Sequence, residues 1–249
     1  MKIKKEAVIG VFVIALIAAA ILGFTGRERD RRRGALAGEI VALNPKNGPP
    51  ETIEGLRTAI KAYEAKIEGH VKDAAQTGVY WKILAYRLQA RGLHGEALKA
   101  LEQAISYNPQ DAALHHLTGI SAGVMAKSSL NFEGSPGNMT RENYYALAEN
   151  GYLRAISLDG RYVPPLYGLG VLYAFELNRP REAIPYLSKS LEISPDADTM
   201  FVLARSYYMI GSYREAAAIY ERIIGFTKDP EKQQEAQINR QLALDRLYG

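Results

Sequence analysis

Cysteine is absent from this 249-residue chain, and histidine is scarce, with four residues. The absence of cysteine excludes disulfide bonds and thiolate metal sites, although it indicates no particular compartment. Two of the histidines, His115 and His116, are adjacent in the sequence. Neighbouring residues on a helix point about 100° apart, so this pair does not easily face one metal ion. We therefore expect no metal site and no cofactor.

Motifs of catalysis are missing as well. The chain has no G-x-x-x-x-G-K-[ST] phosphate-binding loop, no H-E-x-x-H zinc motif and no G-x-S-x-G nucleophile motif. We therefore expect a protein that is not an enzyme. Carboxylates brought together by folding would leave no such motif, so this route to a catalytic site stays open.

Most of the chain also lacks a basic excess, despite its formal net charge of +4. Residues 1–33 hold eight Lys or Arg against three Asp or Glu, a charge of +5, so the remaining residues sum to −1. The basic character belongs to the N-terminus. The rest of the chain gives no reason to expect nucleic acid as a partner.

Residues 7–24 are apolar and contain no charged side chain. As a helix they reach about 27 Å, close to the roughly 30 Å hydrocarbon core of a bilayer. This run predicts a single transmembrane anchor over residues 1–26, of the signal-anchor type because lysines precede it. A cleaved signal peptide is the alternative, but no A-x-A site follows the run and an arginine cluster does. A buried core helix explains it poorly, because the run is apolar on every side.

The flanking charges leave the orientation of this anchor open. Three lysines precede the run and five arginines follow it, which by the positive-inside rule favours a cytoplasmic location for the rest of the chain. A short basic tail is also typical of a secretory signal-anchor, which would place the rest outside the cytoplasm, on the periplasmic side. We favour the periplasmic arrangement and keep the cytoplasmic one open.

Residues 27–50 predict a flexible linker, charged at first and then rich in Gly, Asn and Pro. The next segment, 51–76, has apolar residues at helical spacing, and we interpret it as an N-terminal helix that caps a helical stack. These apolar residues are Ile53, Leu56, Ile60, Tyr63, Ile67 and Val71.

Residues 78–111 form a 34-residue unit with two apolar stripes at helical spacing. The first stripe comprises Trp81, Leu84, Ala85 and Leu88, and the second comprises Ala97, Leu101, Ala104 and Ile105. Gly92 and Gly95 separate the stripes, and Pro109 ends the second. Neither of the two amphipathic helices can bury its stripe alone, so the unit is expected to stack on similar units.

This unit resembles the tetratricopeptide repeat (TPR), which has the same 34-residue period. The eight matching positions are Trp81, Leu84, Ala85, Leu88, Ala97, Leu101, Ala104 and Pro109. The resemblance implies an all-α solenoid of antiparallel helix pairs over residues 51–249. The expected segments are repeats at about 78–111, 112–162, 163–196 and 197–230, and a C-terminal capping helix at 230–248.

The second repeat departs from this pattern by an insertion of about 17 residues, which we place in a loop over 127–142. A tolerated surface loop is one interpretation, and a loop that helps to select a partner is the other. The third repeat has one extra residue, which we place in the loop near 178–180.

In this family the first helix of each repeat lines a concave groove, and the resemblance implies the same here. The groove-facing candidates for partner binding are Lys82, Tyr86, Gln89, His116, Ile120, Val124, Tyr167, Val171, Phe175, Phe201, Arg205 and Tyr208. One subfamily binds C-terminal carboxylates through a Lys/Asn clamp. Lys82 lies in the Lys position, but Tyr86 occupies the Asn position, so we expect no carboxylate clamp.

An apolar and aromatic groove is typical of a protein-binding surface. The sequence therefore predicts a membrane-anchored adaptor that binds a peptide or helix of another protein and performs no catalysis. The alternative is a structural scaffold of a membrane complex, whose repeats self-associate into a homo-oligomer.

Overall fold

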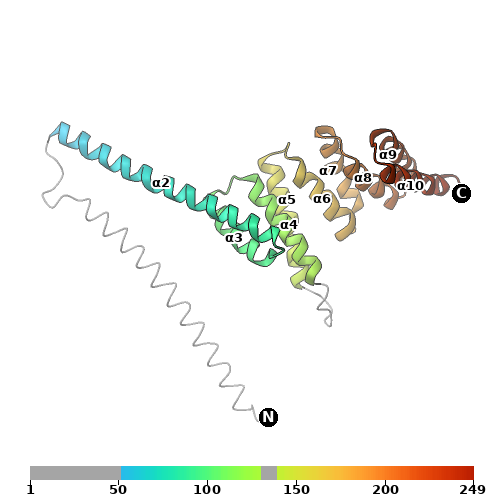
Figure 1. Ribbon diagram of the computed structural model, residues 1–249, viewed down its shortest axis with the longest axis horizontal. Coiled ribbons are helices and arrows are strands. Elements are labelled where there is room, and N and C mark those ends of the chain that lie inside the picture. The colour runs from blue at the N-terminus through green and yellow to red at the C-terminus, as the bar shows by residue number, and fades with distance from the viewer. Residues whose placement is uncertain (1–51, 130–138) are drawn as a thin grey trace, which may run out of the picture. The chain divides into compact units, whose positions relative to one another are not determined.

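The computed structural model describes residues 52–129 and 139–249 (Figure 1). The predicted anchor (1–26) and linker (27–50) lie outside these residues, as does the centre of the predicted insertion. Within the two described ranges, no helix combines the length and the apolar character that crossing a bilayer requires. The chain divides into two compact units, Met1–Gly69 and His70–Gly249.

All regular structure in the described ranges is helical, as the sequence predicts. The helices are, in chain order, α2 (Ile53–Ala90), α3 (His94–Tyr107), α4 (Ala112–Ser128), α5 (Met139–Leu158), α6 (Val163–Val171), η2 (Leu172–Glu176), α7 (Pro180–Ile193), α8 (Ala197–Met209), α9 (Tyr213–Phe226) and α10 (Pro230–Tyr248). Helix α10 covers the same residues as the capping helix expected at 230–248.

Helix α2 is continuous, whereas the sequence predicts a break between a capping helix at 51–76 and the first repeat at 78. The junction has a glycine but no proline, and one glycine costs a helix only about 1 kcal/mol. Gly78 is needed for packing, because a Cβ there would lie 2.7 Å from Tyr107 Cβ. The first half of α2 belongs to the unit Met1–Gly69, where Ile53 and Ile67 are 74% and 63% exposed. These side chains are exposed among the described residues, and the capping of the repeats by this segment stays a prediction.

The unit His70–Gly249 is built from helix pairs, and Figure 1 shows successive helices from α3 to α10 folding back on one another. The pairs are the end of α2 with α3, α4 with α5, α6 and η2 with α7, and α8 with α9, and α10 packs on α9. Gly92 and Gly211 have φ of 75° and 81° at the turns of the first and last pairs, and Asn178 has φ of 52° in the third. Left-handed residues at this position end a helix and reverse the chain.

Small buried residues hold the helix pairs together. Ala85, Ala97 and Ala104 are fully buried, as expected for positions where helix backbones approach closely. A second, larger core runs from α4 to α10. Asp111, Asp196 and Asp229 each accept a backbone hydrogen bond at the start of α4, α8 or α10, which satisfies amides that a helix leaves unpaired.

Both predicted loop insertions are partly helical. At the first, α4 continues to Ser128 and α5 begins at Met139, so both ends of the loop predicted at 127–142 belong to helices, and residues 130–138 lie outside the described ranges. At the second, the extra residue lies inside the first helix of the third pair. The Leu177 amide donates to the Leu172 carbonyl oxygen at 3.0 Å, so η2 is a π-helical turn that absorbs one residue.

Candidate functional site

The predicted groove residues come from the C-terminal part of α2 and from α4, α6, η2 and α8. Two of them link the first pair to the second. The Lys82 Nζ lies 2.6 Å from Asp111 Oδ2, and the Gln89 side-chain amide donates to the Leu117 carbonyl and to the Ser121 hydroxyl, both at 2.7 Å. These two side chains connect helices within the solenoid, whereas Tyr86 between them is 64% exposed.

His116 is a packing residue. Its ring centroid lies 5.8 Å from that of Tyr152 and 5.4 Å from that of Tyr162. Its buried Nδ1 has no hydrogen-bond partner in the described residues. Burial lowers the pKa of His116 to about 4, because the charged imidazolium loses its hydration. The ring is therefore neutral at pH 7, and its contacts are aromatic.

Tyr152 occupies a slot between two helices whose nearest residues are glycines. A Cβ added at Gly119 of α4 would lie 2.5 Å from Tyr152 Cε1, and one at Gly168 of α6 would lie 2.8 Å from the same atom. Any larger residue at either position would displace the ring. The two glycines thus let a side chain of α5 reach between the first helices of the second and third pairs.

An apolar hollow of about 180 Å³ lies next to this ring. Its lining comes from α4, α5, α6 and η2 and comprises Ile120, Gly123, Val124, Lys127, Tyr152, Gly168, Val171, Leu172 and Glu176. Val124 is 39% exposed, and Ile120 and Val171 are half-buried. The hollow brings together three of the predicted groove residues on two successive first helices.

An ion pair forms the polar part of the lining. Lys127 Nζ lies 2.5 Å from Glu176 Oε1, and the Tyr145 hydroxyl donates to Glu176 Oε2 at 3.0 Å. Glu176 is the last residue of η2. Burial, followed by the Glu176 hydrogen bond and charge, raises the pKa of Tyr145, so its hydroxyl keeps its proton at neutral pH. The hollow therefore offers apolar walls with one fixed charge pair.

The predicted groove residues on α8 form a separate aromatic group. The Arg205 guanidinium carbon lies 5.5 Å from the Tyr208 ring centroid, and that ring packs edge-on against Tyr213. Phe201 lies 6.2 Å, centroid to centroid, from Tyr220 of α9. These contacts lie within the last pair, so the structure places this group on different helices from the hollow.

The two remaining candidates differ in exposure. Tyr167 on α6 is half-buried, and burial, followed by the charges of Asp198 and Asp196, raises its pKa. Phe175 in η2 is 47% exposed. The π-helical turn rotates the side chains that follow Leu172 around the helix axis. The family's spacing therefore does not give the direction of the Phe175 side chain unless one residue is allowed for.

Sequence reasoning missed the polar part of the hollow. Lys127 fell in the loop predicted at 127–142. Glu176 lies in the π-helical turn that absorbs the extra residue of the third repeat, whereas the sequence analysis placed that residue near 178–180. Gly119 and Gly168 were visible signals, because paired glycines on neighbouring first helices allow a large ring between them. No group of three or more His, Asp or Glu side chains suited to a metal ion occurs in residues 52–129 and 139–249.

Comparison with known proteins supports the repeat architecture. The family model "Tetratricopeptide repeat" matches residues 169–232, which cover α7, α8, α9 and parts of their neighbours. A TPR repeat-containing protein of Borreliella burgdorferi is 22% identical over 176 residues, covering 70% of this chain and 74% of that protein.

Solved structures show the same fold at low sequence identity. A thermophilic TPR protein of Thermus thermophilus has 19% identity and a TM-score of 0.51, covering 76% of this chain and 96% of that one. MamA of Desulfovibrio magneticus RS-1 has 14% identity and a TM-score of 0.52, covering 69% and 91%. YrrB, a TPR protein with an unusual peptide-binding site, has 19% identity and a TM-score of 0.50, covering 67% and 81%. The helix pairs of this chain thus have the TPR fold, and residues 169–232 match the tetratricopeptide repeat family model.

Proposed function

We propose that this protein is a membrane-anchored adaptor that binds a peptide or helix of another protein on the first helices of its repeats. The observation that carries the proposal is the hollow formed by Ile120, Val124 and Val171 beside the Tyr152 ring. Its volume of about 180 Å³ accommodates one large apolar side chain. Pockets with apolar walls that exclude water are where protein interfaces place their anchor residues.

The partner chemistry follows from this lining. An aliphatic or aromatic anchor side chain fills the hollow, and the Lys127–Glu176 pair lies where it can bond to polar groups flanking that anchor. The exposed Val124 provides the route of entry. YrrB, a TPR protein with an unusual peptide-binding site, supports peptide binding as a role for this fold.

We also propose that residues 7–24 anchor the chain in a membrane and that the repeats lie on the periplasmic side. The support for the anchor is the apolar run with its basic flanks. Protease treatment of spheroplasts tests the orientation. Loss of the repeat domain supports the periplasmic side, whereas protection of that domain until lysis would reverse the assignment.

A matched pair of variants tests the hollow. Val124 and Leu147 are 39% and 40% exposed. Val124 lines the hollow, whereas Leu147 on α5 is not one of its lining residues. Peptides selected from a random library on the full chain in detergent are titrated against Val124→Asp and Leu147→Asp. A carboxylate at position 124 should weaken binding at least tenfold, because an apolar anchor would desolvate it. Equal affinities of the two variants would refute the site.

A further inference from the structure

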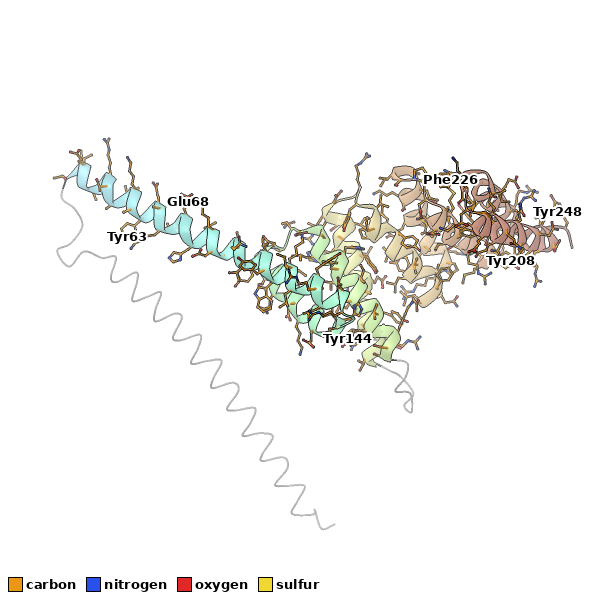
Figure 2. The ribbon with its side chains drawn as sticks, viewed as in Figure 1. Tyr63, Glu68, Tyr144, Tyr208, Phe226 and Tyr248 are labelled. Carbon is orange, nitrogen blue, oxygen red and sulfur yellow. The ribbon has the colours of Figure 1, made fainter. Side chains whose placement is uncertain are left out.

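An apolar stripe along the first half of α2 is exposed among the described residues. Figure 2 shows the side chains of this segment, with Tyr63 labelled, projecting from the helix. The stripe comprises Ile53, Leu56, Ile60, Tyr63 and Ile67, which are 74%, 42%, 55%, 37% and 63% exposed. Exposed apolar residues that follow one helix face usually indicate an interaction surface.

The spacing of the stripe is three, four, three and four residues, which is a heptad repeat. The a positions are all isoleucine (Ile53, Ile60 and Ile67), and the d positions are Leu56 and Tyr63. β-branched residues at a with leucine at d favour two parallel strands, because of the way the side chains insert into the facing helix. A second copy of this same helix presents the complementary surface.

The charges of the segment favour a protein over a lipid surface as the occupant. Residues 53–69 carry three acids and three bases, so their net charge is zero. Helices that lie on membranes usually concentrate Lys and Arg on the polar face. In a parallel pair, Ala59 at g faces Glu64 at e of the other helix, so no like charges meet there.

We propose that residues 53–67 of two copies of this chain form a parallel two-stranded coiled coil. The pairing needs no contribution from the peptide-binding hollow. The affinity of the pairing in a membrane does rest on the proposed function. Anchors at residues 7–24 would hold two chains in the same bilayer and so raise the effective concentration of the two helices. The protein is then a dimer that presents two repeat domains to its partners.

The absence of native cysteine makes the register directly testable. Ile60→Cys and Leu56→Cys place a thiol in the proposed seam, whereas Ala65→Cys places one at an exposed f position. In a parallel pair, seam residues of the two copies lie within reach of a disulfide. Mild oxidation of the full chain in detergent should cross-link both seam variants at least tenfold more than Ala65→Cys. Equal yields at seam and f positions would overturn the coiled coil.

Sedimentation equilibrium provides the second measurement. The unmodified chain should sediment as a dimer, and Ile60→Lys with Ile67→Lys should raise its dissociation constant at least tenfold, whereas Thr58→Lys with Ala65→Lys should not. A monomeric unmodified chain would overturn the proposal. A fluorophore attached to Ile60→Cys provides a further check, because its emission spectrum depends on its surroundings. An emission shift seen only when anionic vesicles are added would also overturn the proposal, because it would assign the stripe to lipid. Peptide binding at the hollow is measured separately, so either proposal can fail alone.

Discussion

Gly151 lies where α5 packs directly on the backbone of α4, and its replacement by alanine should destabilise the repeat domain. A Cβ at this position would lie 2.8 Å from the His115 carbonyl oxygen and 2.9 Å from the Gly119 nitrogen. Both atoms belong to the backbone of α4, so no side-chain rotation relieves the contact. The two helices must separate, and α4 with α5 forms the most extensive contact among the helices from α3 to α10.

The magnitude follows from two opposing terms. Overpacking of a core costs about 1–3 kcal/mol, and a contact with rigid backbone belongs at the upper end of this range. Removing a glycine from a helix interior returns about 1 kcal/mol. The net loss is about 2 kcal/mol, which for a domain of this size lowers the melting temperature by roughly 4–8 °C.

Gly123 provides the matched control on the same pair of helices. It lies inside α4, and a Cβ there would have no atom within 4 Å. Gly123→Ala should therefore raise the melting temperature by roughly 2–4 °C. Only the gain in helix propensity on replacing glycine by alanine remains, because the new methyl group meets no neighbouring atom. Thermal unfolding of the full chain in detergent, followed by circular dichroism at 222 nm, measures both variants. Shifts of the same sign for the two variants would refute the close-approach argument.

Two further predictions concern pH and helix capping. Since burial lowers the pKa of His116 to about 4, the unfolded chain binds a proton between about pH 6.5 and 4 that the folded chain does not, so stability falls as pH drops through this window. After allowance for partial exposure, we expect a loss of about 1 kcal/mol between pH 7 and pH 5 that His116→Phe removes, and identical melting curves against pH for both proteins would contradict this assignment. Asp229 accepts backbone hydrogen bonds at the start of α10, so Asp229→Ala should cost about 1 kcal/mol in urea unfolding and Asp229→Ser much less. A loss of equal size in the serine variant would show that capping is not the cause.

The helix pairs were predictable because they depend on local chemistry. Gly92 and Gly211 interrupt apolar stripes where the chain must adopt positive φ, and Asp229 with Pro230 begins a helix by capping and by a proline at the first helical position. The buried alanines follow from the same repeat spacing. These signals act within one or two helical turns, so a single sequence contains them.

The features that the sequence left undetermined depend on how a chain disposes of one extra residue. A residue inserted near a turn can lengthen the loop or form a π-helical turn inside the preceding helix, and both options keep the apolar positions in register. In this chain the extra residue forms a π-helical turn at Leu172–Glu176, which is identified by the backbone hydrogen bond from the Leu177 amide to the Leu172 carbonyl oxygen. This choice brings Glu176 to Lys127 and completes the polar part of the hollow.

The predicted groove residues show what family positions can and cannot specify. They identify the helix face, but residues on that face serve different ends. Lys82 joins two helices, His116 packs between tyrosines, and Val124 remains partly open beside a hollow.

The same ambiguity applies to the first half of α2, where helical spacing was interpreted as a capping face. A period of 3.6 residues and a period of 3.5 residues differ by less than one residue over the length from Ile53 to Ile67, so spacing alone does not distinguish a face that packs on a repeat from a coiled-coil seam. The side chains from Ile53 to Ile67 in this stripe are 37% to 74% exposed among the described residues, which is compatible with a seam between two copies. In the proposed dimer, the state of association would depend on α2, whereas in the alternative scaffold it would depend on the repeats.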